Sequence, residues 1–301
     1  MQMSSNVVET RDVLAAGGYQ FTLRVTSMLK HNSYPYSHGV RVGGPVDGDG
    51  CVSITVTAQQ EDERFRSALP GHTASLNSVR YSPCCAMDLT LHRGGGTAIM
   101  LRAACAYVVR TYPWVQSFRF CDTSTVACGG INVALPALSL CWSGKTWYEK
   151  EFGAELEDPN AHRRYRELVK EKLQGSRPST FEELCQRATP PASTCELVRA
   201  TYDGARTVQE FFAALKSRED IPFCETVSPW VGDVLDTLLE GMHHGQWTIR
   251  ASSFSAMEFQ VDNQLTAIQC PCCNCCTIRS GCHDVTRVLE QACMTLPIEE
   301  V

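Results

Sequence analysis

The hydrophobic pattern changes its period at the glycine-rich segment 93–97, RGGGT, and this change constrains the fold more than any other feature. Before it, several segments alternate apolar and polar residues, as half-buried strands do. After it, in the segment 99–113, apolar residues recur at helical spacing until Pro113. The segment therefore predicts a strand, a tight glycine turn and a helix, in that order.

Alternating patterns predict a mostly antiparallel sheet in the first ninety residues. Strands are expected at 18–28, 51–58, 75–82 and 85–92. The segment 33–50 is rich in Gly, Pro and Asp, which is typical of a turn or long loop. After the predicted helix, we expect a strand at 115–122 and a helix at 135–156 that turns near Gly153 toward a last strand.

The second half of the chain is more charged and shows helix-start patterns. They are Asp158-Pro159, Ser179-x-x-Glu182, Thr207-x-x-Glu210 and Ser228-Pro229. We place a domain boundary after residue 157, which gives a domain 1–157 and a helical region 158–301 that ends in a Cys-rich segment. His243-His244 lies at a predicted helix end, where a histidine pair is expected to cap carbonyl oxygens rather than to bind metal.

Charge and hydropathy exclude several classes of protein. The 27 Lys and Arg against 33 Asp and Glu give a net charge of −6, so no nucleic-acid partner is expected. No apolar stretch reaches the roughly 18 residues of a membrane helix, and no secretory signal is recognised at the N-terminus. We therefore expect no transmembrane segment, no secretion, and reduced cysteines rather than a disulfide framework.

Cysteines are concentrated near the C-terminus. Seven of the 17 cysteines fall in the last 32 residues, in overlapping Cys-x-x-Cys pairs followed by Cys-His. A structural zinc needs four sulfur or nitrogen ligands, and the predicted set is Cys272, Cys275, Cys282 and His283. Reduced surface thiols, lipidated cysteines and cysteines that cross-link an assembled particle are the alternatives.

Two motifs together resemble the GNAT-type N-acyltransferases. The segment 93–98 fits Arg-x-x-Gly-x-Ala, and the segment 146–154, TWYEKEFGA, is similar to Tyr-Glu-Lys-x-Gly-Phe with Gly and Phe exchanged. The resemblance implies an α/β (α+β) fold with a GNAT-like mixed sheet flanked by helices, over residues 18–157. It also implies acetyl-CoA as cofactor, with its pyrophosphate bound by residues of the glycine turn, namely Arg93, Gly94, Gly96, Thr97 and Ala98.

In the same resemblance Tyr148 is the general acid that protonates the leaving thiolate. The alternatives are a purely structural glycine turn, and a tyrosine that packs in the core beside Trp147 and Phe152. The pattern identifies no general base. By position, the candidates are Glu61, Asp62, Glu63 and Asp88.

A second resemblance points to a viral source. The segment 144–150, GKTWYEK, after a strand and an Asp-x-Ser turn, is similar to proteins of large nucleocytoplasmic DNA viruses, iridovirus-like viruses among them. It implies a non-enzymatic virion component, such as a minor capsid or assembly protein, with other virion or capsid proteins as partners. The expected location is the virion or the cytoplasm of the infected cell. The alternative is an acetyl-CoA-dependent N-acetyltransferase.

Overall fold

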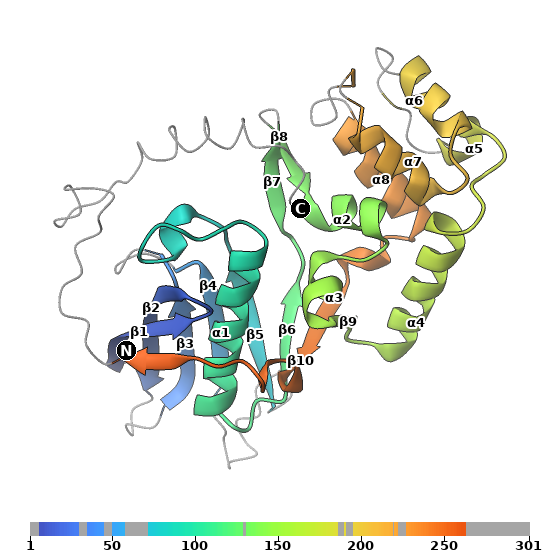
Figure 1. The fold of residues 1–301 in the computed structure, drawn as a ribbon. Coiled ribbons are helices and arrows are strands. Elements are labelled where there is room, and N and C mark those ends of the chain that lie inside the picture. The colour runs from blue at the N-terminus through green and yellow to red at the C-terminus, as the bar shows by residue number, and fades with distance from the viewer. Residues whose placement is uncertain are drawn as a thin grey trace, which may run out of the picture. The chain divides into compact units, whose positions relative to one another are not determined.

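The structure, a computed structural model, describes most of the chain and shows a mixed α and β (α+β) protein (Figure 1). The described residues are 6–29, 35–44, 50–57, 72–128, 131–185, 190, 195–218, 220–221 and 227–262. The Cys-rich segment lies outside them, and with it the predicted zinc ligands Cys272, Cys275, Cys282 and His283.

The chain divides into two compact units. The described residues of the first unit lie in 6–120 and 249–262, and those of the second in 121–248. The boundary that we placed after residue 157 therefore falls inside the second unit. The chain leaves the first unit in strand β6 (Ser117–Cys121) and returns to it in strand β10 (Gln246–Arg250).

The first unit is built on a mixed sheet. Five strands follow one another in antiparallel pairs, namely β1 (Asn6–Ala16), β2 (Tyr19–Leu29), β3 (Pro35–Val42), β4 (Val52–Thr57) and β5 (Thr73–Val79). β11 (Gln260–Asp262) pairs with β1 at the edge, and β6 runs parallel to β5. The order is β11-β1-β2-β3-β4-β5-β6.

Local sequence explains these strands. Gly17 and Gly18 have φ of 56° and 84°, so they form the two-residue turn that joins β1 to β2. The predicted alternation in β2 is confirmed, since Phe21, Leu23 and Val25 are all buried. The same alternation buries Val52, Ile54 and Val56 of β4.

Three expectations for this unit are wrong. The segment expected to be a loop contains β3, whose Val40 and Val42 are fully buried. The segment 85–92 is not a strand: Pro83–Cys85 forms the short 3-10 helix η2, which Ser82 caps, and irregular chain follows. Cys51 and Cys85 form a disulfide, which contradicts the expectation that the cysteines are reduced.

The helix after the glycine turn forms as predicted. Helix α1 (Gly95–Thr111) ends before Pro113 and connects the parallel strands β5 and β6. It packs against β1, β3 and β4 (Figure 1). Its buried residues are mostly small or apolar, Ala103, Ala104 and Val108 among them.

The second unit is mainly helical. Its helices are α2 (Leu135–Ser143), α3 (Trp147–Phe152), α4 (Pro159–Leu168), α5 (Phe181–Leu184), α6 (Cys195–Asp203), α7 (Val208–Lys216) and α8 (Ser228–Leu238), with the short π-helix η3 (Val169–Leu173) after α4. β7 (Thr125–Cys128) and β8 (Ile131–Ala134) form a hairpin, and β9 (Glu155–Leu156) pairs with β10. Aromatic rings from α5 to α8 fill the core.

Helix starts in this unit follow the sequence closely, with two differences. Asp158 and Thr207 cap α4 and α7 as predicted. The capping box of α5 is formed by Thr180 and Glu183, one residue later than expected. The predicted helix 135–156 is two helices, because Gly144, with φ of 67°, ends α2. No helix in the described ranges is long and apolar enough to cross a membrane.

Candidate functional site

The glycine turn forms the N-terminus of α1. Gly94 is the N-cap residue with φ of 73°, a conformation that glycine adopts without strain, and no side chain of the described residues caps the helix. Ala98 N–H donates to Gly94 O at 2.9 Å and so begins the helical pattern. The N–H groups of the first turn point away from the helix and need acceptors of their own. Together with the helix dipole, such groups form a suitable site for an anion.

The residues of this turn differ in what surrounds them. Gly95 is exposed, and a β-carbon there would meet no atom within 4 Å. Gly96, Thr97 and Ala98 are buried, so Gly95 is the residue of the helix start that a ligand can reach most readily. The Thr97 hydroxyl oxygen is buried and has no hydrogen-bond partner among the described residues. The Arg93 guanidinium carbon lies 6.0 Å from the ring centre of Tyr81.

Tyr148, the predicted general acid, lies in the second unit. Its side chain is buried in α3, and its ring centre is 4.8 Å from that of Trp147 and 6.1 Å from that of Phe152. These contacts correspond to the alternative in which the tyrosine is a core residue. The glycine turn belongs to the first unit, so a shared role of the two motifs on one cofactor stays a prediction.

Glu149, the next residue, has a structural role. It closes a capping box with Thr146, whose N–H donates to Glu149 Oε2 at 2.7 Å. The same carboxylate accepts the Tyr165 hydroxyl at 2.8 Å and pairs with Arg166 at 3.2 Å. Burial, with the negative charge of Glu149, raises the pKa of Tyr165. This network gives Glu149 of the Tyr-Glu-Lys motif a structural role that needs no cofactor.

The structure offers no strong general base among the candidates that it describes. Glu61, Asp62 and Glu63 lie outside the described residues. Asp88 is exposed and accepts the N–H of Thr90 at 3.2 Å, and its hydrogen bonds with Thr90 lower its pKa. A carboxylate with a lowered pKa is a weaker base than an ordinary one.

A shallow groove of about 620 Å³ lies elsewhere in the first unit. It is lined by the β1–β2 turn, by Arg110 near the end of α1, and by 258–260. The Arg110 guanidinium donates to Met257 O at 2.8 Å and lies 4.2 Å from the ring centre of Phe259. The groove contains none of the site residues that the sequence predicts.

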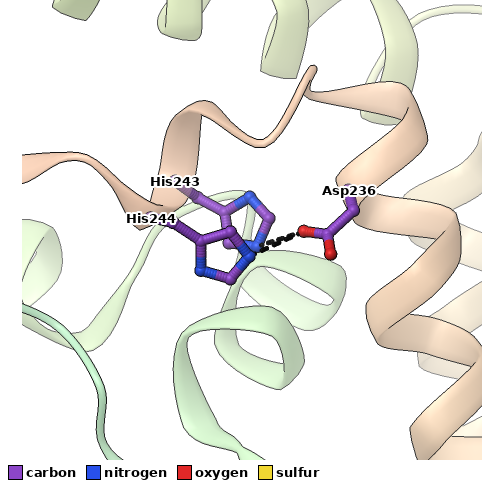
Figure 2. Close-up of side chains that lie close together, drawn as sticks. All are labelled: Asp236, His243 and His244. Atoms are coloured by element: carbon purple, nitrogen blue, oxygen red, sulfur yellow. Dashed lines mark hydrogen bonds and ion pairs between the residues drawn. The ribbon is translucent and has the colours of Figure 1, made fainter.

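A cluster of two histidines and one aspartate lies in the second unit (Figure 2). Asp236 is in the last turn of α8, and His243 and His244 are in the 3-10 turn η5 (Met242–His244). Nε2 of His244 lies 2.8 Å and Nε2 of His243 lies 3.3 Å from Asp236 Oδ1. The histidines therefore face a carboxylate and not the carbonyl oxygens that we expected.

The two histidines have different surroundings. The His243 side chain is 1% exposed and its Nδ1 has no partner among the described residues, whereas the His244 side chain is 57% exposed. Burial is the main cause that lowers the pKa of His243 to about 4, and the adjacent His244 adds to it. His243 is therefore neutral at neutral pH. Sequence reasoning singled out the histidines but missed Asp236.

Comparison of the chain with family models, curated proteins and solved structures finds no match. Neither the acyltransferase resemblance nor the viral one is supported by a relative.

Proposed function

We propose that the first unit binds the pyrophosphate of an acyl-CoA at the N-terminus of α1, and that N-acyl transfer is the activity which this binding serves. The observation that carries the proposal is the uncapped start of a 17-residue helix at three successive glycines. The helix dipole and the N–H groups of the first turn, which no described side chain caps, favour an anion. The open space at Gly95 leaves room for one to approach.

Two further features support this proposal. α1 connects two parallel neighbouring strands, β5 and β6, which agrees with the element order that the acyltransferase resemblance implies. The Thr97 hydroxyl, in the first turn of the same helix, is buried and has no partner within the described ranges. Such a group costs free energy unless something completes its hydrogen bonding. The acid role of Tyr148 and the role of the protein in a virion stay predictions from the two resemblances.

Calorimetric titration with acetyl-CoA tests the proposal, with Gly95→Glu as the blocking variant. Position 95 suits this test because a side chain there meets no neighbour, and a carboxylate in the first turn of a helix favours folding. We expect the wild type to bind with a dissociation constant of about 1 mM or tighter. Gly95→Glu should lose binding, because its charge and bulk oppose the pyrophosphate.

Gly95→Ala is the matched control, since it adds a side chain without charge. It should bind acetyl-CoA as the wild type does. Inorganic pyrophosphate should compete with acetyl-CoA for binding to the wild type and to Gly95→Ala. Equal binding by the wild type and Gly95→Glu would overturn the proposal, and so would the absence of heat in the wild type.

A further inference from the structure

The Asp236, His243 and His244 cluster results from a sharp reversal of the chain. After α8, Glu240 and Gly241 both have positive φ, 53° and 66°, and they turn the chain back toward the helix. The Gly241 N–H donates to Asp236 O at 2.9 Å. This hydrogen bond holds the reversed segment against the last turn of α8. A residue other than glycine is strained in this conformation and keeps it only where the surroundings impose it.

Neighbouring side chains hold this reversal in place. The indole N–H of Trp247 donates to the carbonyl oxygen of His243 at 3.2 Å, and Trp247 is fully buried. Its ring stands perpendicular to that of Tyr165, with the centres 5.5 Å apart. Arg164 pairs with Glu240 at 3.2 Å. The backbone that carries the histidines is therefore anchored in the core of the unit.

The atoms of the cluster converge as metal ligands do. One atom from each of the three side chains lies within 4.8 Å of the other two, and the two nitrogens lie 2.8 and 3.3 Å from the same carboxylate oxygen. Zinc binds histidine nitrogen and carboxylate oxygen at about 2.0–2.2 Å, and tetrahedral geometry then separates ligand atoms by about 3.4 Å. Small side-chain movements would bring the cluster to this geometry.

We propose that Asp236, His243 and His244 form a binding site for one divalent transition-metal ion, of which zinc is the best fit. Two imidazole nitrogens and one carboxylate oxygen favour zinc and its neighbours over magnesium or calcium, which prefer oxygen ligands alone. The side chains of Asp236 and His244 are about half exposed, 49% and 57%. Three protein ligands with an open side leave a coordination position for water or a substrate, as in catalytic zinc sites.

The competing explanation is a hydrogen-bonded cluster without an ion, in which the histidines donate to the carboxylate. Such a cluster needs no metal and binds none. Both explanations leave Nδ1 of the buried His243 without a partner among the described residues, so this atom does not separate them. The two explanations differ in the cobalt and zinc that the protein retains, so metal binding decides between them.

Cobalt binding by the full chain is the test, because tetrahedral Co²⁺ is coloured and occupies zinc sites. The chain carries 17 cysteines, and thiolates also bind both metals. Accessible thiols are therefore first blocked with N-ethylmaleimide, and the protein is then treated with a chelator and loaded with cobalt. We expect about one equivalent of Co²⁺ per chain, with d–d absorption and without thiolate charge-transfer bands, and displacement by zinc.

Two variants remove exposed ligands, His244→Ala and Asp236→Asn. Each should bind cobalt at least about tenfold more weakly than the wild type. His92→Ala makes the same chemical change at an exposed histidine outside the cluster, and it should bind as the wild type does. Urea unfolding of the metal-free proteins checks that all variants fold. If the thiol-blocked wild type retains no cobalt, or if all four proteins retain the same amount, the proposal is wrong.

Discussion

Gly96 lies directly against the side chain of Leu91, since a β-carbon built on Gly96 would come within 2.8 Å of Leu91 Cδ1. Leu91 is itself buried, so it has little room to move. The last glycine of the turn is thus needed for packing inside the unit. The adjacent Gly95 has no such neighbour, so the two glycines have separate roles.

Alanine at these two positions should have opposite effects on stability. Gly96→Ala should lower the free energy of unfolding by about 1–3 kcal/mol, because the added methyl group overpacks the contact with Leu91. Gly95→Ala should raise it by about 0.5 kcal/mol, because alanine loses less entropy in a helix. Urea unfolding of the wild type and both variants measures these differences. A midpoint of Gly96→Ala equal to that of the wild type would show that Leu91 moves aside without a loss of stability.

The disulfide between Cys51 and Cys85 should contribute substantially to stability. It ties the start of β4 to η2 and joins residues 34 apart in sequence. Closing a loop of that size in the unfolded chain corresponds to about 3–4 kcal/mol. The double variant Cys51→Ser, Cys85→Ser should be less stable by about this amount. A reductant should remove the difference, and a difference that persists in reductant would come from the serines themselves.

Glu149 should be important for the stability of the second unit. Glu149→Ala removes the capping box and leaves the buried Tyr165 hydroxyl without its acceptor, and we expect a loss of about 2–4 kcal/mol. Glu149→Gln keeps an acceptor and should lose about 1 kcal/mol. Lys150→Ala, an exposed neighbour, should change stability by less than about 0.5 kcal/mol. Equal effects of Glu149→Ala and Lys150→Ala would contradict the structural role.

The sequence predicted local features well, because their causes are local. Asp158 and Thr207 each cap the helix that follows through a bond to a residue two or three positions on. The error at α5 arose where two overlapping patterns fit, and the burial of Phe181 selects the later one. Helix α1 was found for the same reason, since the helical spacing of its apolar residues is visible within about twenty residues, whereas the strand expected before it at 85–92 does not form.

Features that depend on distant partners were missed. β3 is rich in residues that favour turns, yet it forms because β2 and β4 pair with it on both sides. The disulfide joins cysteines whose pairing the sequence does not reveal. The Asp236 cluster needs the reversal at Glu240, where a residue other than glycine has positive φ. Helical periodicity gives no sign of that reversal.

Asp122 should make stability depend on pH. Its buried carboxyl accepts the Ser124 N–H at 3.2 Å and the Ser124 hydroxyl at 2.6 Å, but burial outweighs these bonds and raises its pKa. The folded state therefore holds this proton more tightly than the unfolded state does. Stability should fall as the pH rises from the ordinary aspartate value of 3.8 through the raised value.

Asp122→Asn tests this dependence, because the amide oxygen keeps the acceptor and does not titrate. The variant should be more stable than the wild type at neutral pH, and the difference should disappear as the pH falls below the ordinary aspartate pKa. Chemical unfolding at pH values from about 3 to about 8 gives the free energy of unfolding of both proteins as a function of pH. Parallel curves would show that Asp122 does not cause the dependence.

Trp247 should position the proposed metal ligands through the carbonyl oxygen of His243. Trp247→Phe keeps a buried ring but removes the indole N–H, so the backbone at His243 gains freedom. Cobalt affinity should fall by about tenfold, as it does when the groups that support a ligand are lost. Trp230→Phe is the matched control, because Trp230 is buried in the aromatic core of the same unit. Both variants should lose stability, but only Trp247→Phe should weaken cobalt binding. Equal affinities in the two variants would show that the indole does not position the site.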